Sequence, residues 1–278
     1  MWRVILLTFF LPVICITSVL AQPSFKAVRI ADINPGPDHG HPGGLTGGAF
    51  KVFRDTLFFR ADDGMYGSEL FKYDGNRTHL VADIHPGKDR LGKPYDSKPR
   101  GFVVFKDELL FRADDGIHGR ELFAYDGQGV RLVADINPVI GDNGNPNGSY
   151  PAGFTILKDM LVFKADDGSH RMELFTYDGE KVRLLADLFQ GRKGSRARDF
   201  TVFKDAIFFS ANDGLRGRTL FTFDGFDVSY VTDVMPGMET YNLPHLSSSN
   251  FTLFNESLYF RAEDIEHGTE LFAFDGDD

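Results

Sequence analysis

The chain has 278 residues, 42% of them hydrophobic, and its 40 acidic residues outnumber its 30 basic residues to give a formal net charge of −10 at pH 7. This acidity argues against nucleic acid and anionic membranes as partners, because both would repel it. Cys15 is the only cysteine, which excludes an internal disulfide, so the fold must be held together by its core and its topology.

Residues 1–21 have the pattern of a secretory signal peptide. After a short positive start, residues 4–20 are almost wholly apolar, and Ala21 supplies the small residue of a cleavage site. We expect cleavage after Ala21, a secreted, extracellular protein, and a single domain over residues 22–278. An N-terminal membrane anchor is the alternative, but no positive flank follows the apolar run. No later segment approaches the roughly 18 apolar residues of a membrane span.

A seven-residue segment recurs five times at intervals of about 50 residues. Two apolar runs precede each copy, as in FKVF and LFFRADDG, and one such as LVADIHPG follows. β-Branched and aromatic runs bounded by Gly, Asp and Asn indicate strands joined by tight turns. Each repeat therefore predicts four strands, the blade of a β-propeller. The copies are ELFKYDG at 69–75, ELFAYDG at 121–127, ELFTYDG at 173–179, TLFTFDG at 219–225 and ELFAFDG at 270–276.

The two ends of the repeat region complement each other. The sequence ends just after the third predicted strand of the last repeat, and residues 25–33 form a predicted fourth strand with no repeat of its own. We expect this N-terminal strand to pair with the last repeat, because closing the ring removes exposed sheet edges. The predicted fold is an all-β, five-bladed β-propeller of four-stranded blades. An open array of five units is the alternative.

The repeats also resemble a known family. ELFKYDG and ELFAYDG, the preceding FRADDGxxGxE and the following LVADIHPG are similar to the ELWxxDGT-repeat (hyalin-like) family of extracellular proteins. The match recurs over residues 25–276, although Phe71 and its equivalents stand where that family has Trp. The resemblance implies a secreted β-propeller. It implies little about activity, because a fold does not fix a function.

A basic residue stands nine positions before the Glu of four repeats, as in Arg60 and Glu69. In the fourth repeat both members change, to Ser210 and Thr219. Because the two positions change together, we expect a direct ion pair across the hairpin. A ring of catalytic carboxylates is the alternative.

Acidic side chains gather in the loop that joins the second and third strands of each blade. In a propeller this loop and the loop between blades leave the same face. Oxygen ligands in flexible, Gly-containing loops suit Ca²⁺, so calcium is the candidate cofactor. The alternative is that these residues satisfy loop amides. The candidate metal ligands are Asp62, Asp63, Asp114, Asp115, Asp166, Asp167, Asp213 and Asp264.

Two further loop features are candidates for binding or modification. A basic run in one loop between blades suits a sulphated glycan or an acidic partner, with a solvated loop as the alternative. Four Asn-X-Ser/Thr sequons predict N-glycosylation. The basic residues are Arg192, Lys193, Arg196 and Arg198, and the sequons begin at Asn76, Asn147, Asn250 and Asn255.

No nucleophile elbow, HExxH motif or phosphate loop occurs in the sequence. A single active site would also need residues that break the repeat symmetry, whereas the prominent carboxylates obey it. We therefore expect a monomeric, non-enzymatic binding or extracellular-matrix module that presents an acidic loop face to a glycan, a protein or a mineral surface. The alternative is a propeller glycoside hydrolase, which would place two carboxylates in the central cleft.

Overall fold

The structure is a computed structural model that describes residues 27–35, 39–42, 50–191, 193–215, 217–231, 251–264 and 267–276. The predicted signal peptide lies outside these residues. The chain divides into two compact units, residues 1–30 and 31–278. Residues 27–30 of the first unit form no strand, and every strand belongs to the second unit. Within the described residues there is no helix, and so none that could cross a membrane.

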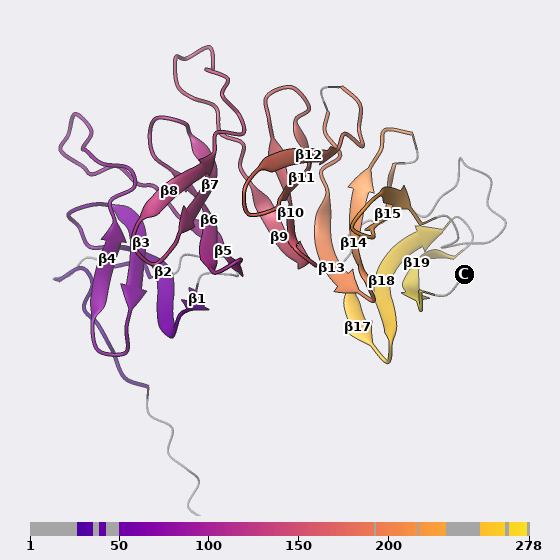
Figure 1. Ribbon diagram of the computed structural model, residues 1–278, viewed down its shortest axis with the longest axis horizontal. Helices are drawn as coiled ribbons and strands as arrows, with labels where there is room; N and C mark the ends of the chain where they lie inside the picture. The colour runs from indigo at the N-terminus through magenta and orange to yellow at the C-terminus, as the bar shows by residue number, and fades with distance from the viewer. Residues whose placement is uncertain are drawn as a thin grey trace, which may run out of the picture. The chain divides into compact units, whose positions relative to one another are not determined.

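The strands form five antiparallel sheets (Figure 1). Within each sheet, every strand pairs with the strands that precede and follow it in the sequence. Sheet 1 contains β1 (Phe50–Phe53), β2 (Thr56–Asp62), β3 (Ser68–Tyr73) and β4 (Thr78–Ala82). Sheet 2 contains β5 (Arg100–Phe105), β6 (Glu108–Asp114), β7 (Arg120–Tyr125) and β8 (Val130–Ala134). Sheet 3 contains β9 (Ala152–Leu157), β10 (Met160–Asp166), β11 (Met172–Tyr177) and β12 (Val182–Ala186). Sheet 4 contains β13 (Arg198–Phe203), β14 (Ala206–Asn212), β15 (Arg218–Phe223) and β16 (Val228–Tyr230), and sheet 5 contains β17 (Thr252–Phe254), β18 (Ser257–Asp264) and β19 (Gly268–Phe274).

Each sheet packs its face against the next sheet through aromatic and aliphatic side chains. Phe58 and Leu70 of sheet 1, for example, share a buried cluster with Phe111 and Phe123 of sheet 2. Equivalent clusters join sheets 2 and 3, 3 and 4, and 4 and 5. Burial of such large apolar side chains is the main stabilising contribution. The predicted all-β class is therefore confirmed, and four of the five predicted blades are four-stranded antiparallel sheets, followed by a sheet of three strands among the described residues.

Closure of the ring is not confirmed. Residues 27–35 form no strand, and sheet 5 has three strands within the described residues. The segment after residue 30 nevertheless sits on sheet 1. Ile33 packs beside Phe59 and Phe71, and the backbone N–H of Asp62 donates to the carbonyl of Gly40 at 2.8 Å. This segment thus occupies the place that a loop between blades takes on the sheet that follows it.

The outer faces of the first and last sheets are more exposed than their equivalents. Leu271 of sheet 5 is 74% exposed, whereas Leu70 and Leu122 at the equivalent position are 0% exposed. Phe50 of sheet 1 is 52% exposed, whereas its equivalent Phe102 is 8% exposed. Both sheets therefore present the apolar positions that bury against a neighbour elsewhere in the chain.

Candidate functional site

The acidic loops are stabilised by their own carboxylates. Asp62 Oδ1 accepts the backbone N–H of Gly64 at 2.8 Å, and Asp63 Oδ1 accepts those of Met65 and Tyr66 at 2.9 and 3.0 Å. Gly64 has φ +77°, which favours glycine. The same bonds to loop amides recur at Asp114, Asp115, Asp166, Asp167 and Asp213, with Asn212 in the place of Asp62.

This arrangement matches the alternative in which the carboxylates satisfy loop amides. Among the described residues, no three His, Cys, Asp or Glu side chains are grouped so that they could hold a metal ion. Asp264 is the last residue of β18, and its side chain lies outside what the structure describes. Calcium binding by these loops stays a prediction.

Two of the acidic loops contain a histidine that pairs with the second aspartate. His118 Nδ1 lies 2.7 Å from Asp115 Oδ2, and His170 Nδ1 lies 2.7 Å from Asp167 Oδ2. In both cases the hydrogen bond to the carboxylate raises the pKa of the histidine. Each histidine thus closes its own loop rather than reaching toward another blade.

The predicted ion pair between Arg60 and Glu69 is wrong. Glu69 lies opposite Ala61 in the β2–β3 ladder, and Arg60 lies opposite Leu70. Because successive side chains of a strand point to opposite faces of the sheet, Arg60 and Glu69 face away from each other. The change to Ser210 and Thr219 in the fourth repeat therefore does not mark a contact between those two positions.

The glutamates instead hold the loops between blades. Glu69 is buried and accepts the backbone N–H groups of Ile84 and Ser97 at 2.9 and 2.8 Å, together with the Ser97 hydroxyl at 2.5 Å. Glu121 is bound in the same way by Ile136 and Ser149. Burial raises the pKa of Glu69 and of Glu121 to about 7, against the opposing effect of these hydrogen bonds.

The third repeat continues the pattern, and the later repeats depart from it. Glu173 is buried and accepts the N–H groups of Leu188, Phe189 and Ser195, and burial raises its pKa. Thr219 takes the place of the glutamate in the fourth repeat, and the segment that follows, 232–250, lies outside the described residues. Glu270 in the fifth repeat is exposed.

The serine bound by each glutamate also contacts the next sheet. The carbonyl of Ser97 accepts the backbone N–H of Asp114 at 3.0 Å, and that of Ser149 accepts the N–H of Asp166 at 2.8 Å. Each glutamate is therefore connected through one serine to the acidic loop of the following blade. The recurring glutamates thus stabilise the loops between blades by accepting their backbone N–H groups.

The basic run lies where this face breaks the repeat symmetry. A cavity of about 370 Å³ opens between the loop 187–197 and sheet 4. Lys193 and Arg196 line it from the loop, and Arg218 lines it from β15. Arg198 in β13 lies 3.4 Å from Asp199 instead, and Arg192 lies outside the described residues. The remaining lining residues are Phe189, Gly194 and Asn212.

Arg218 is a residue of this cavity that the sequence analysis missed. Its guanidinium donates to the Ser210 hydroxyl at 3.0 Å, to the Ser210 carbonyl at 3.2 Å and to the Arg196 carbonyl at 3.1 Å. Three of its five N–H donors are thereby fixed within the protein. Arg218 lies 22 residues after Arg196, so only the pairing of strands and loops reveals that the two residues meet.

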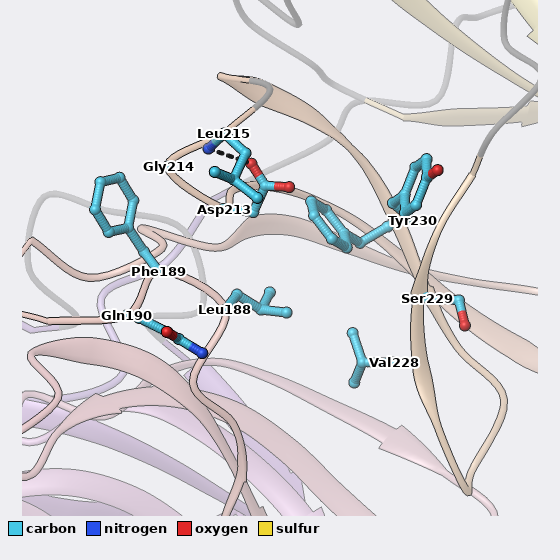
Figure 2. A pocket seen from close by; sticks show the side chains of 10 residues that line it. Leu188, Phe189, Gln190, Asp213, Gly214, Leu215, Val228, Ser229 and Tyr230 are labelled. Atoms are coloured by element: carbon cyan, nitrogen blue, oxygen red, sulfur yellow. Dashed lines mark hydrogen bonds between the residues drawn. The ribbon is translucent and has the colours of Figure 1, made fainter. Parts of the chain in front are cut away.

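A larger cavity of about 780 Å³ adjoins this region (Figure 2). In Figure 2, Leu188 and Phe189 approach it from the loop after β12, Leu215 from the β14–β15 loop, and Val228 from β16. Phe189 lines both cavities. The side-chain carboxylate of Asp213 accepts the N–H of Leu215 at 2.9 Å and so shapes the rim.

Three of the four predicted glycosylation sites are placed on the surface. Asn76, Asn147 and Asn255 are exposed, in the β3–β4 turn, the loop between sheets 2 and 3, and the β17–β18 turn. Asn250 lies outside the described residues. Exposure is what modification requires, and glycosylation itself stays a prediction.

Comparisons with known proteins give matches to solved structures only, since no protein-family model and no curated protein matches the chain. A GH74 xyloglucanase from Xanthomonas campestris aligns at 12% identity and a TM-score of 0.47, over 84% of this chain and 39% of the enzyme. The β-propeller domain of the Trilobed protease from Pyrococcus furiosus aligns at 13% identity and a TM-score of 0.43, over 82% of this chain and 69% of that domain. A GH62 α-L-arabinofuranosidase from Coprinopsis cinerea aligns at 11% identity and a TM-score of 0.35, over 87% and 93%. At these identities and TM-scores, the names of these proteins assign no activity to the chain.

Proposed function

We propose that this protein is a secreted, non-enzymatic binding module on a closed, five-bladed β-propeller, and that it binds an extracellular ligand through its loop face. The observation that carries the proposal is the internal use of the repeated carboxylates. Glu69 and Glu121 are fully buried and bound to loop amides, and Asp62 and Asp63 cap amides of their own loop. A carboxylate engaged in this way serves the fold, so ligand contacts belong to positions where the repeats differ.

The loop 187–197, which is described except for residue 192, differs from its equivalents in the charges that it brings to a cavity. The equivalent loop after sheet 1 contributes Asp96 and two lysines to its own cavity, whereas Lys193 and Arg196 line theirs with no acidic neighbour among the described lining residues. The adjoining 780 Å³ cavity falls in the size range of ligand sites. These two cavities make the junction of sheets 3 and 4 the favoured binding region.

Ring closure is the second part of the proposal. Phe254 and Leu271 of sheet 5 correspond to Phe53 and Leu70 of sheet 1, which bury against sheet 2. Phe254 and Leu271 are 61% and 74% exposed. We infer that they pack on the outer face of sheet 1, where Phe50 is also exposed, and that the predicted N-terminal strand within residues 25–33, ahead of the contact made by Ile33, supplies the fourth strand of sheet 5. Removing this apolar surface from water would stabilise the closed ring.

A glycan array combined with a hydrolysis screen on the same purified protein tests the proposed function. We expect saturable binding to a defined glycan class without release of reducing ends. Turnover of a bound glycan would overturn the proposal in favour of a glycoside hydrolase. Binding to extracellular proteins or mineral particles alone, with no glycan bound, would keep the binding module and change the class of its ligand.

A further inference from the structure

The 370 Å³ cavity between the loop 187–197 and β15 is lined by three cations from two separate segments. Lys193 and Arg196 come from the loop, and Arg218 comes from the following sheet. No acidic residue is among the described residues that line it. This is unexpected in a chain with a net charge of −10, because clustered like charges repel one another unless a counter-ion is present.

The cations are held in place by the fold. Gly194 has φ +68°, and a Cβ there would lie 2.8 Å from the backbone nitrogen of Met172, so the loop turns sharply between Lys193 and Arg196. Ser195 is buried and bound to Glu173, which fixes the loop on sheet 3. Arg218 is fixed by its bonds to Ser210 and to the Arg196 carbonyl. Among the described residues, these bonds take three of the five N–H donors of its guanidinium and leave two for a ligand.

Other charged groups act on Arg218. Burial, followed by the neighbouring charge of Arg218, lowers the pKa of Lys164 in β10. Burial and then Arg198 lower the pKa of Arg218, whereas the Asp199 carboxylate raises it. Like charges that depress one another's pKa in a half-buried region are stabilised when an anion binds among them.

We infer that this cavity binds the sulfate group of a sulfated glycan. A sulfate ester has three terminal oxygens, which can accept hydrogen bonds from the three cations that the loop and β15 supply. A carboxylate, in contrast, is satisfied by a single bidentate arginine. The cavity is a hollow of the size that receives one ligand unit, whereas an acidic protein would present its charges to an open surface. The inference rests on the proposed binding function and names its ligand class.

The test measures binding of the whole secreted protein to a heparin tetrasaccharide, its fully desulfated form and a poly-glutamate peptide. The variant Lys193→Gln with Arg196→Gln removes two exposed cations. Lys181→Gln, which removes an exposed lysine in the β11–β12 turn, is the matched control. We expect binding of the sulfated probe that weakens as salt rises. We expect about a tenfold or larger loss in the double variant and less than about a twofold change in the control, because hydrogen bonds between charged groups are stronger than those between neutral ones. Thermal unfolding of the double variant should match that of the wild type.

Three outcomes would overturn the inference. Equal affinity of the wild type and the double variant for the sulfated probe would place the binding elsewhere. Preference for poly-glutamate would assign the cavity to an acidic protein. Binding of the desulfated tetrasaccharide as tightly as the sulfated one would refute the sulfate site while the proposed function stands, whereas failure of every extracellular ligand class would refute the proposed function itself.

Discussion

The carboxylate of Glu69 receives both the backbone N–H and the hydroxyl of Ser97, a residue 28 positions later in the loop that leads to sheet 2. The carbonyl of the same serine accepts the N–H of Asp114 in the next acidic loop. One buried glutamate thus orders the loop between two blades and connects it to the following blade.

Replacing Glu121 by alanine should destabilise the protein strongly. The substitution leaves the buried N–H groups of Ile136 and Ser149 without an acceptor, and unmade buried hydrogen bonds of this number should cost about 3 kcal/mol in the free energy of unfolding. Urea denaturation measures the change. Glu180→Ala, an exposed glutamate in the β11–β12 turn, is the control and should stay within about 0.5 kcal/mol of the wild type.

The same variant also tests the corrected role of Arg112. Because Arg112 lies opposite Leu122 and not Glu121, the free energies of the single variants Arg112→Ala and Glu121→Ala should add in the double variant. A coupling energy above about 1 kcal/mol would restore the direct ion pair.

Stability should fall as the pH rises from about 5 to 8. The folded pKa of Glu69 and of Glu121 is raised to about 7, whereas an unfolded glutamate titrates near about 4.3. Between these values the folded state binds more protons than the unfolded state, so its stability is greatest at low pH and is lost as the pH rises through 7. Melting temperatures measured across this range should decline.

Glu69→Gln with Glu121→Gln should flatten this decline, because glutamine does not titrate. The glutamine NH2 replaces an oxygen that accepts a backbone N–H, so the melting temperature should also be lower at low pH. His118→Gln with His170→Gln measures the separate contribution of the histidines, which is also lost as the pH rises because the pKa of each histidine is raised. If the melting temperature of Glu69→Gln with Glu121→Gln declined with pH as steeply as that of the wild type, the two glutamates would not be the groups that titrate in this range.

The caps of the acidic loops predict different effects for two substitutions of Asp63. Asp63→Asn keeps an oxygen acceptor for the N–H groups of Met65 and Tyr66, so its stability in calcium-free buffer should be near that of the wild type. Asp63→Ala should lose about 1 kcal/mol, as loss of such a cap does in helices. Thermal unfolding with about 1 mM Ca²⁺, the range of extracellular calcium modules, extends the test. If these loops bind calcium, calcium should raise the melting temperature of the wild type but not that of Asp63→Asn.

If the ring is closed, truncating Leu271, which is exposed in the structure, should destabilise the protein as much as truncating the buried Leu122. Leu122→Ala should cost about 2–5 kcal/mol, the usual range for a buried leucine. In a closed ring Leu271→Ala should cost a similar amount, although Leu271 is 74% exposed in the structure. Unfolding of Leu271→Ala at the wild-type denaturant midpoint would contradict closure and favour an open array.

Much of the blade structure was predictable from sequence, because apolar runs and Gly-containing turns are local signals that recur five times. The role of Glu69 was not predictable in this way, since its partners Ile84 and Ser97 lie 15 and 28 residues away. Recurrence of charge at two positions suggested a contact, but the strand register places the two side chains on opposite faces. Arg218 was missed for a related reason, because its place in the basic cavity depends on packing between two sheets.

The central claim is that the repeated carboxylates maintain the fold and that binding belongs to positions where the repeats differ. Its most direct test is the affinity of one array-identified glycan for two variants, Lys193→Gln with Arg196→Gln, and Glu121→Gln, each measured below its own melting temperature. We predict that the first loses about tenfold or more in affinity and that the second binds as the wild type does, with no turnover in either. The claim would be contradicted if Glu121→Gln lost glycan binding while Lys193→Gln with Arg196→Gln bound as the wild type does. It would also be contradicted if the wild type cleaved the glycan and Glu121→Gln did not.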